Sequence, residues 1–153
     1  MDWRVRAIRG AITVPENTIE AITLAVTELL DELEEKNRIF PDQIISMTFS
    51  VTRDLDAIFP AAVARLRPGW DQVPLLDVQH MHVESALLRC IRFLLHVNMP
   101  AEQVVYHPYL RHAQKLRPDW LEAQSVSPGI GSFPGRAWER TTRGTPTPHF
   151  NQL

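Results

Sequence analysis

Residues 44–52, IISMTFSVT, decide how this chain is expected to fold. Apolar and hydroxyl side chains alternate strictly from Ser46 to Thr52, and a period of two places each kind on its own face of a β-strand. The segment therefore predicts a strand that buries Met47 and Phe49 in a core and turns its hydroxyl groups to the other side.

The segments around this strand show further apolar periods. Residues 3–14 alternate as a strand does. Residues 17–37 carry apolar side chains at helical spacing behind a capping-box pattern formed by Asn17 and Glu20. The other predicted elements are a short helix at 54–66 with Pro60 near its first turn, short strands at 73–78 and 104–110, and a helical turn at 111–116.

Residues 86–97, ALLRCIRFLLHV, form an apolar run whose structure the residues alone leave open. A buried strand and a buried helix both fit, because periodicity does not separate them in such a run. In a strand, Arg92 would share its face with Leu88, Cys90 and Leu94.

The composition is that of an ordinary globular protein. The 153 residues, 44% hydrophobic and 22% charged, suit one domain with its own core. No apolar run reaches about 18 residues, so no membrane span is expected. The N-terminal MDWRVRAIRG lacks the apolar segment of a secretory signal, and a lone cysteine, Cys90, fits a reducing compartment. A cytoplasmic location is therefore expected.

The composition changes after about Ala123. Residues 123–153 are rich in Pro, Gly, Ser and Thr and have no apolar period, which predicts a flexible tail behind a folded domain at 1–122. A role for this tail in binding a protein partner stays open.

The basic residues favour arginine strongly. Of 16 Lys and Arg residues, only Lys36 and Lys115 are lysine. The planar arginine fork suits carboxylates, although a GC-rich genome would produce the same bias. The net charge of −2 argues against a nucleic-acid partner.

Two arginines lie on apolar faces of predicted strands. Arg9 shares its face with Val5 and Ala7, and Arg92 lies in the apolar run at 86–97. A buried guanidinium is costly unless paired, and arginine does not lose its proton in proteins. With Arg117 as a third candidate, the pattern predicts either a site for a carboxylate ligand or internal ion pairs with Asp or Glu.

Four segments together carry a resemblance to a known family. They are RAIRGAITV at 6–14, TRDLDAIFPAAVAR at 52–65, RCIR at 89–92 and YLRHAQKLRPD at 109–119. In this order and spacing the chain resembles the AroH-class chorismate mutases over roughly residues 4–120.

The resemblance implies an α+β fold. In that fold a mixed β-sheet has helices packed on one side, and three chains form a homotrimer with a pseudo-α/β-barrel core. Residues 86–97 are then a strand, and each active site lies between neighbouring subunits.

The resemblance also implies the site residues. Arg9 matches an arginine that holds a substrate carboxylate, and Arg92 matches the one on the ether oxygen and a carboxylate. Three residues are implied to close over the substrate: Tyr109, Leu116 and Arg117. The adjacent chain is implied to contribute Phe59 and Ala61, with Arg65 as a nearby basic residue, and His80 stands where the family has a glutamate on the substrate hydroxyl.

The chain departs from the family pattern at several of these positions. Ala62 replaces a lysine near the cleft mouth, and Leu76 and Asp77 replace a threonine and a cysteine. The change to His80 keeps the capacity to hydrogen-bond but predicts an altered pH dependence.

The implied reaction is the intramolecular rearrangement of chorismate to prephenate in phenylalanine and tyrosine biosynthesis. It needs no cofactor, metal or nucleophile. The implied partners are the substrate chorismate and two further copies of the chain, with no nucleic acid and no membrane.

Other functions stay open at this point. His80 and His82 would share a strand face and could form half of a metal site, although no third ligand is evident. Cys90 is interpreted as a core residue rather than a nucleophile. The alternative function is that of a non-catalytic or imine-deaminase-like trimer that binds a small carboxylate.

Overall fold

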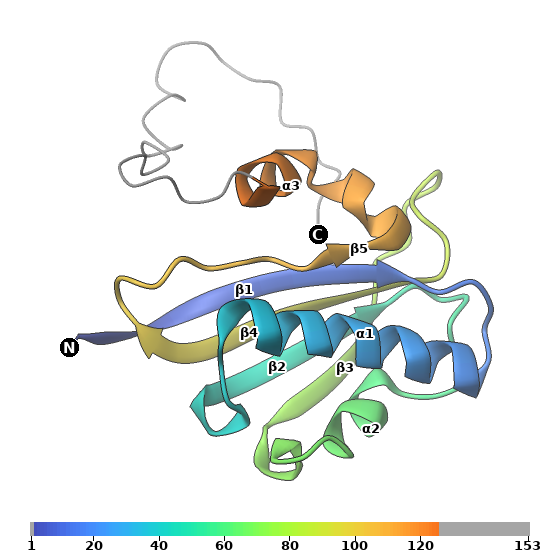
Figure 1. The fold of residues 1–153 in the computed structure, drawn as a ribbon. Helices are drawn as coiled ribbons and strands as arrows, with labels where there is room; N and C mark the ends of the chain where they lie inside the picture. Colours follow the sequence, from blue (N-terminus) through green and yellow to red (C-terminus); the bar gives the residue numbers. More distant parts are fainter. Residues whose placement is uncertain (1, 126–153) are drawn as a thin grey trace.

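The fold is a five-stranded mixed sheet with helices packed on one face (Figure 1). The computed structural model describes residues 2–125. The strands are β1 (Trp3–Thr13), β2 (Ile44–Val51), β3 (Leu75–Gln79), β4 (Cys90–Pro100) and β5 (Tyr109–Leu110). Their order is β3-β2-β4-β1-β5, in which β4 pairs antiparallel with β1 and β2 while β3 and β5 join in parallel. The predicted α+β class is confirmed.

The central strands follow the predicted alternation. Met47 and Phe49 of β2 are fully buried, as expected from the IISMTFSVT pattern. The run at 86–97 is resolved as a strand, since β4 begins at Cys90 and pairs on both of its edges. From Ile91 to Met99 every second residue of β4 is buried, whereas Leu94 on the other face is 41% exposed, so the apolar run is not buried on both faces.

Two helices cover one face of the sheet. Helix α1 (Ile19–Asn37) lies across β1, β4 and β2, and α2 (Pro60–Arg65) packs beside it near β3 (Figure 1). Pro60 is the first residue of α2, where its missing N–H costs no helical hydrogen bond. No helix within residues 2–125 has both the length and the apolar character needed to cross a bilayer.

The predicted cap of α1 was one residue off. Thr18, not Asn17, caps the helix, because its hydroxyl accepts the Ala21 N–H at 3.1 Å. Asn17 instead binds the loop before α2, where its Oδ1 accepts the N–H groups of Asp56 and Ala57. Asn17, which the local pattern predicted as the helix cap, therefore makes a tertiary contact instead.

The strand predicted at 104–110 is mostly wrong. Only Tyr109 and Leu110 form β5, which pairs with Ala11 and Ile12 of β1. Pro108 precedes the strand and has no N–H to extend the ladder.

The predicted boundary between residues 122 and 123 falls inside a helix. The turn at Arg111–Leu116 is a 3-10 helix, and α3 (Pro118–Ser125) follows it. Residues 126–153 of the predicted tail lie outside the described residues, so the division into 1–122 and 123–153 stays a prediction.

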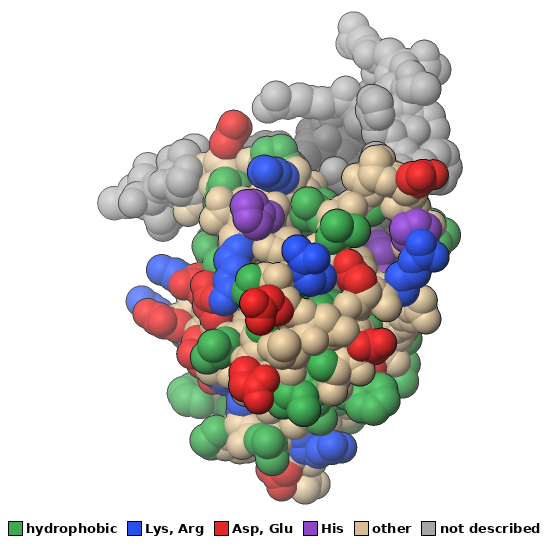
Figure 2. All heavy atoms as spheres, turned by 90° about the vertical axis from the view of Figure 1, so that its right-hand side faces the viewer, with side chains coloured by type: hydrophobic (Ala, Val, Ile, Leu, Met, Phe, Trp, Pro, Cys, Tyr) green, Lys and Arg blue, Asp and Glu red, His purple; other side chains and the backbone are tan. Residues whose placement is uncertain are grey.

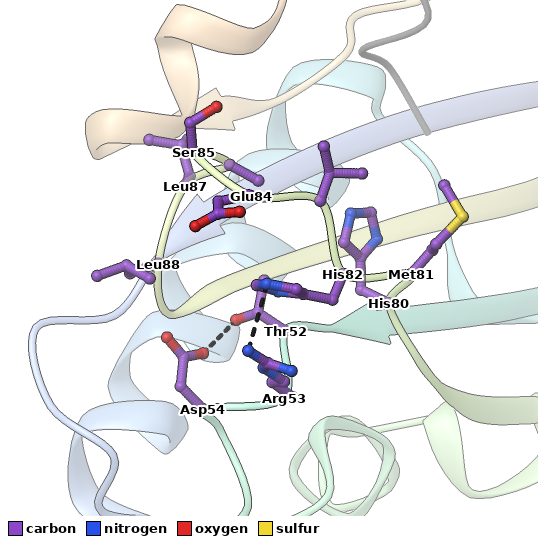
Figure 3. Close-up of a pocket in the computed structure, with 12 residues that line it drawn as sticks. Thr52, Arg53, Asp54, His80, Met81, His82, Glu84, Ser85, Leu87 and Leu88 are labelled. Atoms are coloured by element: carbon purple, nitrogen blue, oxygen red, sulfur yellow. Dashed lines mark hydrogen bonds between the residues drawn. The ribbon is translucent and has the colours of Figure 1, made fainter.

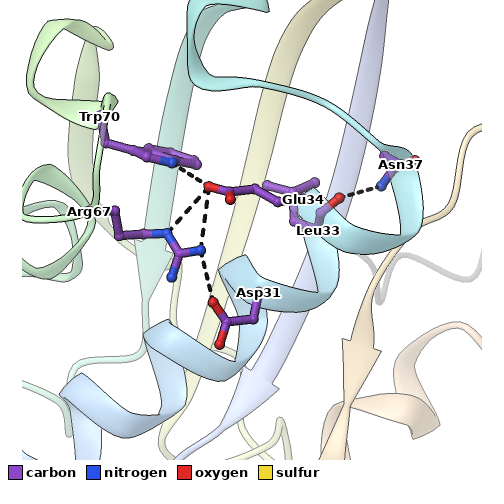
Figure 4. Close-up of polar contacts among 6 residues, drawn as sticks. All are labelled: Asp31, Leu33, Glu34, Asn37, Arg67 and Trp70. Atoms are coloured by element: carbon purple, nitrogen blue, oxygen red, sulfur yellow. Dashed lines mark hydrogen bonds and ion pairs between the residues drawn. The ribbon is translucent and has the colours of Figure 1, made fainter.

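Glu34 ties α1 to the segment that follows α2 (Figure 4). Its carboxylate accepts the Trp70 indole N–H at 2.5 Å and the Arg67 Nε–H at 3.4 Å. Asp31 accepts a second bond from Arg67 at 2.9 Å. Because Trp70 is fully buried, this contact satisfies the one polar group that it brings into the core.

Asn37 is a buried polar link between α1 and the chain leading to β5. Its amide donates to the carbonyls of Leu33 (3.0 Å) and Tyr106 (2.9 Å), and its Oδ1 accepts the Tyr106 N–H at 2.8 Å. Asn37 itself is 0% exposed, so water does not replace these bonds.

Replacing Asn37 with alanine is expected to lower the free energy of unfolding by about 2 kcal/mol, since partly buried backbone groups of Tyr106 lose their partner. Urea denaturation at fixed protein concentration measures the change. Glu35→Ala, at an exposed position of the same helix, is the matched control. Equal stability of both variants would contradict the prediction.

Candidate active site

The pairing register places Arg92 and Tyr109 on either side of a small residue. Ala11 of β1 pairs with Arg92 of β4 on one edge and with Tyr109 of β5 on the other. Directly paired residues point to the same face, here the face without α1. Ala11 is fully buried and packs in a cluster that includes Tyr109.

Three guanidinium groups act electrostatically on Tyr109. Its side chain is buried, which raises the pKa of the phenol, while the positive charges of Arg9, Arg117 and Arg92 act in the opposite direction. The net shift is upward, so the hydroxyl stays protonated at neutral pH and is available as a hydrogen-bond donor. These three arginines are called the arginine group below.

The members of the arginine group have different immediate partners. Arg117 forms a two-point ion pair with Asp119, through Nε at 3.1 Å and Nη2 at 2.8 Å. Within residues 2–125 Arg9 has no carboxylate partner, so the ion-pair explanation holds for Arg117 and not for Arg9. The positive charge of Arg92 lowers the pKa of the Cys90 thiol, against the larger effect of burial.

An aromatic stack adjoins the arginine group. The Trp120 ring of α3 lies 3.4 Å from Cζ of Arg117 and 5.9 Å from Cζ of Arg9. Its other neighbour is His107, whose ring centroid is 4.0 Å away with the planes 18° apart. Tyr109 meets the same indole edge-on at 5.7 Å between ring centroids.

His107 is held in its neutral form. Burial is the main cause that lowers its pKa to about 4; the charges of neighbouring arginines act in the same direction, and a backbone hydrogen bond opposes them. That bond runs from the Arg9 N–H to Nδ1 of the imidazole at 3.0 Å. The ring therefore acts as an acceptor that fixes the backbone of β1 beside the site.

Leu116 packs against a small apolar cluster, and its predicted contact with the substrate stays a prediction. The cluster contains Ala11, Cys90, Tyr109 and Ala113. Cys90 is 1% exposed and burial raises the pKa of its thiol, which confirms its interpretation as a core residue.

His80 and His82 have separate partners. His80 lies 3.0 Å from the Ser50 hydroxyl through Nδ1, and burial together with the Arg92 charge lowers its pKa. His82 contacts Arg53 at 3.2 Å (Figure 3). Among the described residues, no group of three side chains suited to a metal includes this pair.

A cavity of about 470 Å³ adjoins these histidines. The loop at 80–88 forms one wall, and Thr52, Arg53 and Asp54 form the other (Figure 3). Viewed from the end of the molecule where β1 ends, the visible histidines lie in the upper half, among basic and acidic side chains (Figure 2). This end of the sheet is thus charged and hollowed.

A second group of predicted residues lies near the β3 edge of the sheet. Phe59 lines a cleft of about 510 Å³ together with Asp77, and it is 70% exposed. Asp77 accepts the Ala61 N–H at 3.1 Å; burial raises its pKa, and Arg65 partly offsets that rise. Phe59, Ala61 and Arg65 are called the α2 group below.

The chain does not bring the two groups together. The arginine group surrounds Tyr109 near the β5 edge, whereas the α2 group lies at the β3 edge, at the other end of the strand order. Sequence reasoning named both groups but missed His107 and Trp120. For Trp120 the sequence did offer a signal, because this aromatic residue follows Arg117 by only three positions.

These features are those of an α+β protein whose sheet carries a cluster of cations, an arrangement suited to a small anionic ligand. Comparison with known proteins makes this specific. Residues 5–120 match the family model for chorismate mutase type I. The chorismate mutases AroH of Bacillus subtilis and Thermus thermophilus are 39% and 46% identical over 117 and 122 residues. These alignments cover 75% and 78% of this chain and 91% and 99% of the relatives.

A solved structure agrees with the sequence matches. A chorismate mutase from Clostridium thermocellum is 43% identical, with a TM-score of 0.69 over 72% of this chain and 99% of that one. The chain therefore belongs to the type I chorismate mutases, the isomerases that convert chorismate to prephenate in aromatic amino acid biosynthesis. This assignment is favoured over the alternative of a non-catalytic or imine-deaminase-like trimer.

Proposed function

We propose that the chain catalyses its reaction as a homotrimer, with the arginine group of one chain facing the α2 group of its neighbour. The placement of these arginines carries this proposal. Arg92 and Tyr109 flank Ala11 in the sheet register. Arg9 and Arg117 lie over the ring of Trp120, which meets Tyr109 edge-on. Chorismate has two carboxylates and an ether oxygen that becomes negative as its C–O bond breaks. A cluster of fixed cations matches both features.

The proposed roles follow from the chemistry of the rearrangement. One C–O bond breaks while one C–C bond forms, with no proton transfer. Arg92 meets the charge on the ether oxygen, because β4 pairs on both edges and holds its side chain above the sheet. Arg9 and Arg117 bind the carboxylates and keep the substrate in its compact reactive conformer.

The remaining residues complete the enclosure. Tyr109 donates from its protonated hydroxyl, and Leu116 supplies an apolar wall. His80, with one ring nitrogen engaged by Ser50, offers the other to the substrate hydroxyl. Phe59 and Ala61 of the adjacent chain close the opposite side, and Arg65 adds a positive charge there.

The face of the sheet opposite α1 and α2 supports assembly with further copies. It exposes Val5 (56%), Leu94 (41%) and Leu76 (58%), which belong to three different strands. Leaving such side chains in water forgoes the free energy of burying them, which favours covering this face with another chain.

Mixing two damaged chains tests the shared site. Arg92→Ala and Arg65→Ala are each expected to lower activity, and trimers re-formed from an equal mixture should regain about a quarter of wild-type turnover, because one site in four combines two intact halves. Native mass spectrometry of each variant should give the mass of an assembly of three chains.

The unmixed variants, denatured and refolded separately, are the control for this experiment. A mixture whose turnover equals the average of its parents would contradict a site shared between chains. A monomeric mass for the active wild-type protein would contradict the trimer. The absence of a cofactor and the cytoplasmic location stay predictions.

A further inference from the structure

The indole ring of Trp120 contacts the guanidinium groups of two arginines that come from distant parts of the chain. Arg9 belongs to β1 and Arg117 follows the 3-10 helix that ends at Leu116, more than a hundred residues later. Both guanidinium carbons face the Trp120 ring, at 5.9 and 3.4 Å from its centroid. A cation at these distances is attracted to the electron-rich face of an indole, which is the strongest of the aromatic partners.

Arg117 is held from two directions. Asp119 accepts from Nε and Nη2 at one edge of the guanidinium, while Trp120 covers its face. Arginine has five N–H groups in a rigid plane, and within residues 2–125 this ion pair occupies two of them. The group is therefore fixed in orientation yet keeps donors for an incoming carboxylate.

Trp120 is itself fixed by His107. The two rings stack at 4.0 Å, and the neutral imidazole accepts the Arg9 N–H. Gln124, one turn further along α3, donates from Nε2 to the His107 carbonyl at 3.0 Å and accepts the His107 N–H through Oε1. One helix is thereby attached to the segment that orients Arg9.

We propose that Trp120 is a positioning residue that orients Arg9 and Arg117 for the two carboxylates of the substrate. This inference rests on the carboxylate roles proposed above for these two arginines. A long arginine side chain samples many rotamers in water, so a ring that restricts it beforehand lowers the cost of binding. Trp120 acts through the arginines and does not touch the reacting atoms.

The test compares side chains that differ in their π-face. Trp120→Leu is expected to raise KM about 5- to 10-fold, the range of a partly buried cation–π contact, with a smaller change in kcat. Trp120→Tyr should give an intermediate KM, because tyrosine keeps a weaker π-face. Leu121→Ala, at a neighbouring position of α3 that is 38% exposed, is the matched control.

A double variant separates positioning from simple support of α3. If Trp120 acts through Arg117, adding Trp120→Leu to Arg117→Ala should raise KM less than it does in the wild type, because the coupled partner is gone. Additive effects on KM, or a Trp120→Tyr variant as impaired as Trp120→Leu, would overturn the inference.

The outcome also distinguishes this inference from the proposed site. A KM unchanged by Trp120→Leu while Arg117→Ala raises it would defeat only the role of Trp120. A KM unchanged by Arg117→Ala would defeat the role of Arg117 as a carboxylate ligand, and the inference about Trp120 with it.

Discussion

Replacing Arg92 with alanine is expected to lower kcat about 100-fold or more, the loss seen when one donor to a developing oxyanion is removed. The side chain lies beside Ala11 and Ser50 in the sheet register and acts electrostatically on both Tyr109 and His80. No neighbouring group moves to replace a cation fixed on a strand that is paired on both edges.

Arg92→Lys should also be strongly impaired. Lysine restores one positive charge but presents it as a point, so it does not bind the ether oxygen and a carboxylate at the same time. Following the loss of chorismate absorbance gives kcat for both variants. Arg4→Ala, at an exposed arginine of β1, is the control, and near-normal kcat in either Arg92 variant would refute the role.

The second large effect is expected from Gly10→Ala, which should lower the free energy of unfolding by about 3 kcal/mol, at the upper end for overpacking. A Cβ at this position would lie 2.6 Å from the Pro108 carbonyl oxygen and closer still to the ring of Phe93. The Pro108 carbonyl accepts the Ala11 N–H at 2.9 Å, so the clash pushes β5 away from β1. Because β5 carries Tyr109, activity should fall as well.

Urea denaturation and the chorismate assay together measure this effect. The double variant Gly10→Ala/Phe93→Leu removes part of the ring and leaves the carbonyl in place. The double variant should recover part of the lost stability, because it relieves the clash of the new Cβ with the Phe93 ring but not the clash with the Pro108 carbonyl. Wild-type stability and turnover in Gly10→Ala would show that the close approach of Pro108 is not required.

Much of the architecture was predictable because it depends on local periodicity. The alternation around Phe49 and the helical spacing along α1 are set by backbone geometry, and the structure follows both. The exceptions involve competition from distant groups. Asn17 binds the α2 loop rather than α1, and Pro108 limits β5 to two residues.

The site was predictable as a set of residues but not as an arrangement. Arg9 and Arg92 stood out because a guanidinium on an apolar face needs an explanation. Arg117 has an internal carboxylate partner in Asp119, which an isolated sequence position does not reveal. His107 was missed because its role depends on a backbone N–H of β1, nearly a hundred residues away.

By itself, the sequence determined β1, β2 and α1 and which cations needed a partner, because these follow from the period of side chains and the cost of burying charge. Only the tertiary structure decided that Arg92 and Tyr109 flank Ala11 and that Trp120 adjoins Arg9 and Arg117. These contacts depend on the register between strands that are distant in the sequence and on where α3 packs. Long-range pairing of this kind is set by how all faces bury together, which no local pattern encodes.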